Sequence, residues 1–358
     1  MISIILGTRP EIIKMSPIIR ECERQDIDYF ILHTGQHYSY KLDKIFFEEL
    51  ELPEPEYHLE VGSGTHAEET GKMLIGIEKI LIKERPDVVL VEGDTNTVLA
   101  GALAASKLHI KVGHVEAGLR SYDRRMPEET NRVLTDHVSD YLFAPTEVSK
   151  ENLLREGIIN GVYVVGNTVV DATYQNIEIA MKSSNILNEL NLKALDYFLI
   201  TLHRAENVDD KDRLKEILIA FNRLSETYEI PLIFPIHPRT RKMIDRFGLG
   251  SMLDCTEIIE PVGYLDFLIL EKNARLILTD SGGVQEEACI LNVPCVTLRD
   301  NTERPETVEV GKNVLAGAES ENITRCVDEI LNRRLSDANP FGDGRTGERI
   351  MGLSLIHI

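Results

Sequence analysis

The chain has 358 residues, 43% of them apolar and 27% charged, so it can bury a sizeable core and, at typical domain length, form about two domains. This composition excludes a disordered chain, a collagen-like repeat and a small disulfide scaffold. The net charge of −20 repels polyphosphate chains and anionic membrane surfaces, so we expect neither a nucleic acid nor a membrane as partner.

Cysteine usage and the apolar runs bear on the compartment. The five cysteines are scattered and form no CxxC pair, which is typical of reduced thiols in a cytoplasmic protein. Met1 runs into the apolar segment 2–6 without a basic leader, and no apolar run approaches the roughly 18 residues needed to span a bilayer. We therefore expect a cytoplasmic protein without disulfides or a membrane anchor.

Short β-branched runs alternate with longer segments of helical spacing, which is typical of β-α-β units on a mostly parallel sheet. In the first half, strands are predicted at 2–6, 29–33, 88–91, 112–115, 141–144 and 162–165. In the second half, strands are predicted at 197–202, 232–236, 275–279 and 295–298, with helices over 212–226 and 284–291. The pattern predicts an α/β protein of two doubly wound domains.

The boundary between the two domains is predicted near Met181, where an amphipathic helix over 169–181 gives way to the polar stretch 182–191. The N-terminal domain then covers 1–181 and the C-terminal domain 182–358. Ligands of open α/β sheets bind beyond the carboxyl ends of the strands, so two facing sheets would place the functional residues in a cleft between domains.

The first predicted strand ends in Gly7-Thr8-Arg9-Pro10-Glu11. Pro10 suits the first position of a helix, and Arg9 and Lys14 lie near the start of that helix. Two cations at the carboxyl end of a strand in a strongly acidic protein indicate a phosphate site, although surface cations without a role are common.

Three carboxylates of the first domain lie just past predicted strands or in the loop that follows: Asp94, Glu116 and Glu128. If they converge, repulsion and burial would raise at least one pKa toward neutral pH, as a general acid or base requires. The alternative is that each carboxylate caps a solvated loop. Their joint placement at strand ends favours proton transfer.

Two histidines also follow predicted strands, His203 after 197–202 and His237 after 232–236. Each could donate to phosphate or transfer a proton, with a structural role as the alternative. His33 and His37 are four residues apart, but Gly35 between them argues against the helix that metal-ligand spacing would need, and no HExxH occurs. No GxGxxG opens a helix either, so we expect neither a metal nor bound NAD.

The sharpest local motif is Thr279-Asp280-Ser281-Gly282-Gly283, which lies between a predicted strand and a predicted helix. Glycines allow close approach of a ligand, and the free N–H groups at the helix start favour phosphate. The alternative is an ordinary serine N-cap. Glu287, one turn inside the helix, could accept hydrogen bonds from a ribose diol or complement the helix dipole.

Taken together, these motifs resemble the non-hydrolysing UDP-N-acetylglucosamine 2-epimerases over essentially the whole chain. The motifs that carry the resemblance are Gly-Thr-Arg-Pro-Glu (7–11), Gly-Asp-Thr (93–95), Gly-His-Val-Glu-Ala-Gly-Leu-Arg (113–120), Pro-Glu-Glu-Thr-Asn-Arg (127–132), Gly-Asn-Thr (166–168), Asp-Ser-Gly-Gly-Val-Gln-Glu-Glu (280–287) and Thr-Glu-Arg-Pro-Glu (302–306).

The resemblance implies the glycosyltransferase-B architecture, two Rossmann-like domains around a cleft, with the C-terminal helix packed back on the first domain. It implies interconversion of UDP-N-acetylglucosamine (UDP-GlcNAc) and UDP-N-acetylmannosamine (UDP-ManNAc) for surface polysaccharides, through UDP elimination and 2-acetamidoglucal. The family needs no metal or NAD and commonly forms homodimers.

The resemblance also implies roles for particular residues. Proton transfer is implied for Asp94, Glu116 and Glu128, with Arg132 orienting Glu128 and His203 near the diphosphate. Diphosphate and sugar contacts are implied for Arg9, Lys14, Ser281, Gly282, Gly283 and Arg304, a ribose contact for Glu287, and a uracil pocket over 260–267 in which Phe267 packs on the base and the backbone of Val262 reads its edge. His237 is a further substrate contact.

The sequence departs from the family pattern at a few positions. Ala205 replaces an arginine that is frequent in bacterial members, next to His203. Tyr40 and Lys44 replace glutamines that help some bacterial members hold an activating second UDP-GlcNAc, which argues against such activation. Residues 352–358 do not continue the usual amphipathic C-terminal helix, which indicates an altered or truncated C-terminus.

Other functions fit the same motifs. A hydrolysing relative would release free N-acetylmannosamine, and an epimerase for a diacetamido uronic acid nucleotide would differ only in its pocket. A transferase, or a binding module with idle carboxylates, would keep the fold and change the class, but no acceptor path or membrane-facing patch is evident.

Overall fold

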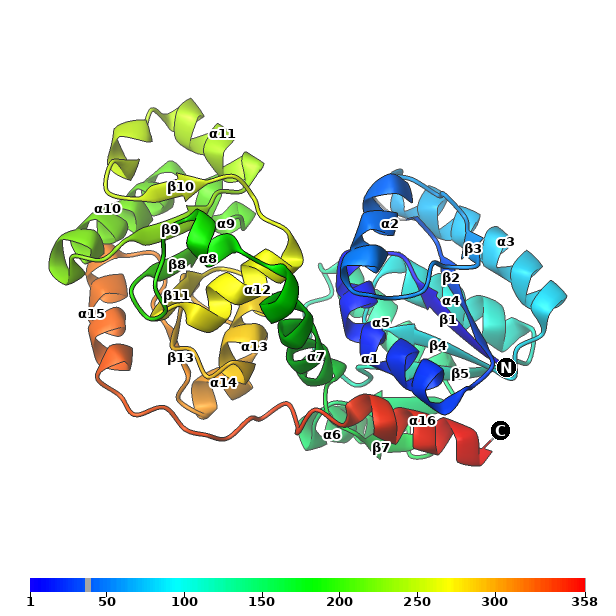
Figure 1. The fold of residues 1–358 in the computed structure, drawn as a ribbon. Coiled ribbons are helices and arrows are strands. Elements are labelled where there is room, and N and C mark those ends of the chain that lie inside the picture. The colour runs from blue at the N-terminus through cyan, green and yellow to red at the C-terminus, as the bar shows by residue number, and fades with distance from the viewer. Residues whose placement is uncertain (36–39, 358) are drawn as a thin grey trace. The chain divides into compact units, whose positions relative to one another are not determined.

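The computed structural model describes residues 1–35 and 40–357 and divides into two compact units (Figure 1). Unit 1 comprises Met1–Gln175 together with Phe341–Ile358, and unit 2 comprises Asn176–Pro340. Each unit is built on its own sheet, in which neighbouring strands run parallel. The prediction of two doubly wound α/β domains is confirmed.

The sheet of unit 1 has the strand order β3-β2-β1-β4-β5-β6-β7. Its strands are β1 (Ile2–Leu6), β2 (Tyr29–His33), β3 (Tyr57–His58), β4 (Val88–Glu92), β5 (Lys111–Val115), β6 (Tyr141–Ala144) and β7 (Val162–Val164). Its helices are α1 (Arg9–Gln25), α2 (Tyr40–Glu49), α3 (His66–Glu84), α4 (Asn96–Lys107), α5 (Pro127–Val138), α6 (Glu147–Arg155), the first part of α7 (Thr168–Ser183), and α16 (Thr346–His357). Strands β1 and β4 are buried throughout, as expected for parallel strands covered by helices on both faces.

The sheet of unit 2 has the order β10-β9-β8-β11-β12-β13, which is the nucleotide-binding order 3-2-1-4-5-6 when its strands are numbered from the first. Its strands are β8 (Phe198–Thr201), β9 (Leu232–Pro235), β10 (Glu257–Ile259), β11 (Leu276–Thr279), β12 (Cys295–Thr297) and β13 (Asn313–Leu315). Its helices are α8 (Ile186–Glu189), α9 (Ala205–Val208), α10 (Lys211–Tyr228), α11 (Pro238–Phe247), α12 (Tyr264–Asn273), α13 (Gly282–Ile290), α14 (Pro305–Glu309) and α15 (Ser320–Leu331), with a 3-10 turn at Gly250–Leu253.

Every predicted strand is present, with ends that differ by no more than one residue. The predicted helices correspond to α7, α10 and α13. The prediction missed β3, β10 and β13, which lie at sheet edges and have only two or three residues each. Edge strands are partly solvated, so they lack the continuous apolar run by which the central strands are found.

The division between the units falls at Gln175, within α7, and not at Met181. Early in this helix, the carboxylate of Asp171 accepts a hydrogen bond from the Gly347 N–H of unit 1 at 2.9 Å. Just beyond the helix, Ser184 Oγ donates to Asp266 of unit 2 at 2.5 Å. The polar stretch after the helix therefore did not mark the boundary, because α7 itself packs partly in each unit.

The C-terminal helix α16 belongs to unit 1, where it packs against α1. Ile350 and Met351 are fully buried, and Met351 Sδ lies 4.0 Å from Cys22 Sγ of α1. The chain stays helical as far as His357, although residues 352–358 do not continue the amphipathic pattern expected from the family. Leucine and isoleucine extend a helix by propensity alone, whatever the amphipathic pattern.

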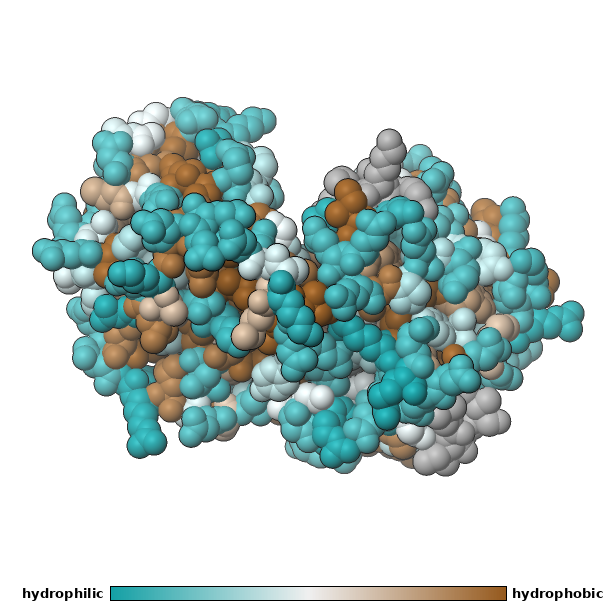
Figure 2. Space-filling view, viewed as in Figure 1, coloured by the Kyte–Doolittle hydropathy of each residue, from teal (hydrophilic) through white to brown (hydrophobic). Residues whose placement is uncertain are grey.

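Each unit has its own apolar core, formed in unit 1 between β1, β4, α3 and α4 and in unit 2 between β8, β9, α10 and α15. Figure 2 shows hydrophilic residues over most of the visible face of both units. Among residues 1–35 and 40–357, no helix has both the length and the apolarity to cross a bilayer.

Truncation of Phe221 tests the core of unit 2. Its ring is fully buried and lies edge-on to Phe234, with centroids 6.2 Å apart. We expect Phe221→Ala to lower the free energy of unfolding by about 3–5 kcal/mol through lost burial and the cavity left behind, as measured by denaturant titration. The control is Leu195→Ala in the same unit, which removes a side chain that is 63% exposed and is expected to cost less than about 0.5 kcal/mol. Equal losses in the two variants would contradict this assignment of the core.

Candidate active site

Three of the predicted site residues of unit 1 lie at the switch point of its sheet. At this point β1 and β4 are neighbours, and the chain continues from β1 to one side of the sheet and from β4 to the other. Lys14 lies in α1, which follows β1. Asp94 follows β4, and Glu116 follows β5 directly. Ligands of doubly wound sheets bind at this position, so the parallel topology alone brings these side chains to one end of the sheet.

Lys14 and Glu116 form a buried ion pair. Lys14 Nζ donates to both Glu116 carboxylate oxygens, at 2.7 and 2.8 Å. Asn167 Nδ2 donates to Glu116 Oε1 at 3.0 Å. Glu116 has φ of +69°, a conformation that is costly for a residue with a side chain and that clusters at functional sites. Lys14 is predicted to contact phosphate. In this structure it pairs with Glu116, one of the carboxylates expected to transfer a proton.

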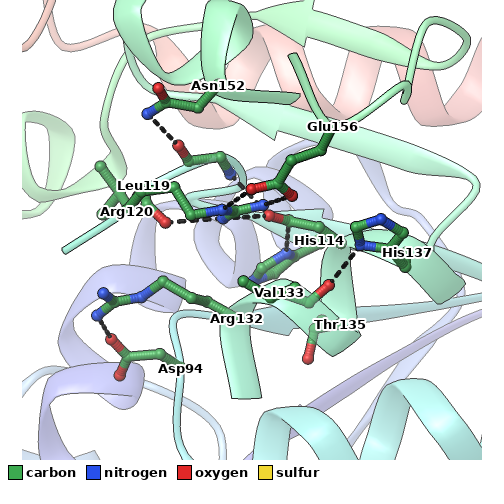
Figure 3. Close-up of polar contacts among 12 residues, drawn as sticks. Asp94, His114, Leu119, Arg120, Arg132, Val133, Thr135, His137, Asn152 and Glu156 are labelled. Carbon is green, nitrogen blue, oxygen red and sulfur yellow. Dashed lines mark hydrogen bonds and ion pairs between the residues drawn. The ribbon is translucent and has the colours of Figure 1, made fainter. Parts of the chain in front are cut away.

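Asp94 and Arg132 also form an ion pair, drawn in Figure 3. Arg132 is predicted to orient Glu128, whereas in this structure Arg132 Nη1 pairs with the neighbouring Glu129 Oε2 at 2.7 Å. Glu129 is buried and accepts further hydrogen bonds from the N–H groups of Ser121 and Tyr122, both at 2.9 Å. Glu128, one position earlier in α5, is exposed. Arg132 therefore bridges Asp94 and the loop before α5.

A buried network that the sequence did not reveal supports the loop after Glu116. Asp136 Oδ1 lies 2.7 Å from His114 Nδ1, and Asp136 Oδ2 lies 2.7 Å from Arg120 Nη1. Arg120 also pairs with Glu156 at 2.6 Å (Figure 3). Burial opposes ionisation of Asp136, but His114 and Arg120 hold its pKa below its usual range. These side chains fix both ends of the segment that carries Glu116.

The turn between β1 and α1 is tightly packed and places Arg9. A Cβ at Gly7 would lie 2.1 Å from Thr34 Oγ1 and 2.4 Å from Thr97 Oγ1, so only glycine fits. The Glu11 carboxylate accepts the N–H groups of Gly7 and Thr8 at 2.5 and 3.2 Å, which completes the capping box of α1. The half-buried Arg9 lies with its guanidinium 5.6 Å from the ring centre of Phe46.

A pocket of about 670 Å³ also opens on unit 1, next to the Arg120 network. It is lined by Arg120, Tyr122, Arg124, Glu129, Thr130, Val133, Leu134, His137 and Glu156. None of the predicted site residues lines it, so the pocket is separate from the carboxylates at the strand ends.

Unit 2 has its own switch point, between β8 and β11. His203 follows β8, and its Nδ1 lies 3.2 Å from Asp280 Oδ1, which follows β11. Asp280 is fully buried and accepts the N–H groups of His203 and Arg204, at 3.1 and 2.9 Å. Burial opposes its ionisation, but the His203 contacts and these donors lower the pKa of Asp280. The sequence motif contained Asp280 without assigning it this orienting role.

His237 lies beside this pair, with its ring centre 5.9 Å from that of His203. Its Nδ1 accepts the N–H of Arg239 at 3.2 Å, so it caps helix α11. Burial, followed by His203 and Arg239, lowers the pKa of His237. The exposed face of its ring remains available for a ligand contact.

The Ser281-Gly282-Gly283 segment begins α13 as predicted, with Ser281 as N-cap. The Ser281 side chain makes no cap hydrogen bond, unlike in the alternative of an ordinary serine N-cap. A Cβ at Gly283 would meet no atom within 4 Å, so packing within unit 2 does not require glycine there. The open helix start is suited to an anion, because its N–H groups carry partial positive charge.

Glu287 of α13 is buried together with a second carboxyl, Glu271 of α12. Burial, followed by the charge of Glu287, raises the pKa of Glu271 well above its usual range. Burial and Glu287 also raise the pKa of Tyr264. The raised pKa favours a neutral Glu271 beside Glu287, and the ribose contact of Glu287 stays a prediction.

The remaining predicted contacts of unit 2 lie on neighbouring segments. Arg304 Nε donates to Glu286 Oε1 at 2.5 Å, which fixes the arginine against α13. Val262 and Phe267 are half-buried, at and after the loop that leads into α12. Each of these residues has surface available to a ligand, and their binding roles stay predictions.

Among the residues that the structure describes, no group of three or more His, Cys, Asp or Glu side chains is placed to hold a metal ion. His33 is buried in β2 and its ring centre is 5.7 Å from that of His58. Burial and then His58 lower the pKa of His33 to about 4. His37 lies outside the described residues, as does the side chain of Tyr40 in the segment considered for activation, whereas Lys44 pairs with Glu54 at 2.5 Å.

The two switch points, one with paired carboxylates and the other with a histidine–aspartate pair beside an open helix start, define a two-domain Rossmann-like protein of the glycosyltransferase-B type. The family model described as UDP-N-acetylglucosamine 2-epimerase matches residues 20–354. The chain is 65% identical over 356 residues to the UDP-N-acetylglucosamine 2-epimerase of Methanocaldococcus jannaschii, with 98% of this chain and 97% of that one covered. The chain belongs to the UDP-N-acetylglucosamine 2-epimerase family.

Two further comparisons bear on the substrate. The crystal structure of the Methanocaldococcus jannaschii UDP-GlcNAc 2-epimerase in complex with UDP-GlcNAc and UDP is similar with a TM-score of 0.87 and 64% identity, covering 99% of each chain. The UDP-2,3-diacetamido-2,3-dideoxy-D-glucuronate 2-epimerase of Pseudomonas aeruginosa is 44% identical, covering 97% of each chain. The resemblance stated from the motifs is confirmed at the level of the family.

Glu11 makes the stability of the protein depend on pH. Burial raises the pKa of Glu11 to about 7, although hydrogen bonds from Thr95, Gly7 and Thr8 act to lower it. The folded state therefore binds more protons than the unfolded chain between about pH 4.5 and 7, and stability falls as pH rises through this window. Over this pH window, we expect the free energy of unfolding of the wild type to fall by about 3 kcal/mol relative to that of Glu11→Gln. Denaturant titrations at several pH values measure this difference.

Glu68 supplies the matched control for this prediction. It holds the same third position in the capping box of α3 but is exposed, and hydrogen bonds from Thr65 lower its pKa. Relative to Glu68→Gln, the wild type is expected to show no such loss of unfolding free energy as the pH rises. A Glu11 difference that does not vary with pH would contradict the prediction.

Proposed function

We propose that the protein interconverts UDP-GlcNAc and UDP-ManNAc by reversible elimination and re-addition of UDP through 2-acetamidoglucal. The observation that carries the proposal is the presence, in a chain of this family, of two carboxylates at the switch point of unit 1. These are Asp94, paired with Arg132, and Glu116, paired with Lys14. The 64% identical epimerase structure is a complex with UDP-GlcNAc and UDP, which supports the same substrate for this chain.

The reaction needs a base, an acid and cations. A base removes the weakly acidic proton at sugar C2 while the C1–O bond breaks and its electron pair leaves with UDP, so that a C1–C2 double bond forms. On return, UDP adds to C1 and an acid delivers a proton to the opposite face of C2. Positive groups near the diphosphate lower the barrier because charge develops there in the transition state.

The contacts of this chain support a division of these tasks. In unit 1, Glu116 and Asp94 are candidates for proton transfer, with the exposed Glu128 as the third carboxylate. Lys14 pairs with Glu116, and Arg132 pairs with Asp94. Neither face of C2 is assigned to a particular carboxylate.

In unit 2, the helix start at Ser281 to Gly283, together with Arg304, is proposed to hold the diphosphate. His203, oriented by Asp280, is proposed to donate to the departing phosphate. Glu287, the segment with Val262, and Phe267 are proposed to hold the uridine. The scheme uses no metal and no NAD, because each step is a proton transfer or a C–O bond cleavage.

We infer further that the enzyme acts as a homodimer in the cytoplasm and supplies UDP-ManNAc for surface polysaccharides. Identity is higher with the UDP-GlcNAc epimerase, at 65%, than with the diacetamido glucuronate epimerase, at 44%. This difference favours UDP-GlcNAc over the more elaborate sugar nucleotide.

Proton NMR of the purified protein with UDP-GlcNAc in heavy water tests the proposal. We expect UDP-ManNAc to appear, and both UDP-ManNAc and UDP-GlcNAc to gain deuterium at C2, because each reversal of the reaction exchanges the C2 proton with solvent. Free N-acetylmannosamine and UDP would instead identify a hydrolysing enzyme. An unchanged spectrum with folded protein would overturn the substrate, and the diacetamido uronic acid nucleotide is then the next compound to add.

Substitution of the two carboxylates tests their roles. Asp94→Asn and Glu116→Gln keep shape and remove the acid–base group, so we expect kcat to fall at least about 100-fold while UDP affinity stays close to wild type in calorimetry. Glu147→Gln is the matched control, since it neutralises an exposed carboxylate at the start of α6. Full activity in both site variants would remove them from the mechanism.

A further inference from the structure

Glu92 is a buried carboxyl that none of the sequence motifs singled out. It is the last residue of β4, is only 2% exposed, and pairs in register with Val115, the residue before Glu116. Its Oε1 lies 3.4 Å from Lys14 Nζ and has no hydrogen-bond partner among the residues that the structure describes. A carboxyl in this setting needs an explanation, because burial of an unpaired charge is costly.

The charges at this place do not balance with both carboxyls ionised. Lys14 Nζ donates to both oxygens of Glu116, at 2.7 and 2.8 Å, and Asn167 adds a third donor to the same carboxylate at 3.0 Å. One ammonium compensates one carboxylate, and Glu116 receives the donors. Glu92 is left at the longer distance of 3.4 Å, where ionisation would place a second negative charge beside Glu116.

The charged groups that face Glu92 come from two segments of the chain. Lys14 and Glu11 face it from α1, and Glu116 faces it from the loop after β5. Burial raises the pKa of Glu92 most, Lys14 opposes this, and Glu116 and Glu11 raise it further, so that it lies well above the usual range. Both carboxyls contact the same Lys14 ammonium, Glu92 at 3.4 Å and Glu116 at 2.7 Å, so a protonated Glu92 has the Glu116 carboxylate beside it as an acceptor.

We propose that Glu92 is a positioning residue that stays protonated in the resting enzyme and donates a hydrogen bond to Glu116, which fixes this carboxylate and keeps it ionised beside Lys14. A protonated Glu92 thereby leaves the Lys14 ammonium with one charged partner, Glu116. Loss of its proton would add a second anion beside Lys14 and Glu116. The effect on turnover rests on the proposed function, whereas the protonation state does not.

Carbon NMR of the free enzyme, labelled at the glutamate side-chain carboxyl carbons, tests the protonation state without any substrate. The Glu92 signal is the one that disappears in Glu92→Gln. At pH 7 we expect this signal at the position of a protonated carboxyl, with its titration at higher pH. A signal at the ionised position at pH 7 would overturn the proposal, whether or not the protein turns over UDP-GlcNAc.

The pH profile of kcat tests the effect on Glu116, with two variants that separate donor from charge. Glu92→Gln keeps an N–H donor but cannot ionise, so we expect the alkaline fall of kcat to move up by at least about one pH unit while the acidic limb stays in place. Glu92→Met removes the donor, so we expect the acidic limb to move up by about one unit, because Glu116 then holds a proton more readily.

Asp171→Asn is the matched control. It removes another buried carboxyl of unit 1 whose pKa is raised by burial, and its hydrogen bond is to Gly347 rather than to the Lys14 cluster. We expect it to leave both limbs in place. If the Glu92 variants lower kcat uniformly without moving either limb, Glu92 is a structural residue only. Absence of turnover in wild type would remove the proposed function, and the carbon NMR result would still decide the protonation state.

Discussion

Parallel pairing of the strands is the constraint on which the polar clusters of unit 1 and of unit 2 both depend. A parallel sheet brings the carboxyl ends of all its strands to one edge, and the change of chain direction beside the first strand leaves a gap between the loops at that edge. In unit 1, this places α1 beside the residues after β4 and β5. In unit 2, it places the residue after β8 beside the residue after β11. No long loop is needed to assemble either cluster.

The second requirement is that buried charges at these edges be compensated within a few ångströms. Asp136 faces His114 and Arg120, Asp280 faces His203 and backbone N–H groups, and Glu116 faces Lys14. Removal of one partner would leave an uncompensated charge in a poorly solvated place, which costs far more than an exposed ion pair gains. Each network therefore tolerates few arrangements, and this restriction is what gives the proposed acids and bases fixed positions.

Much of this arrangement can be predicted from the sequence, and the part that cannot has a physical cause. The central strands are apolar over their whole length, so their positions follow from composition, and strand-end residues such as Asp94 and His203 follow from the strands. Pairing among polar side chains does not follow in this way. Glu128 and Glu129 lie four and three residues before Arg132, so either could pair with it on a helix. Glu129 is the one held in place, because it accepts N–H groups of the loop before α5.

The same limit applies to Glu92, which looks like the end of an ordinary strand in the sequence and becomes unusual only because Lys14 and Glu116 arrive beside it from distant segments. Edge strands and the division within α7 were missed for a related reason. Their positions are set by tertiary contacts and not by local pattern.

The discontinuity of unit 1 has a consequence for biosynthesis. Because residues 176–340 lie between its two segments, a ribosome completes the whole of unit 2 before it makes α16. Until then, the α1 surface that receives Met351 and the Asp171 carboxylate that receives Gly347 are without their partners. Domains fold as units during synthesis, so the inserted unit can reach its native state first. The first unit to be translated is then the last to be completed.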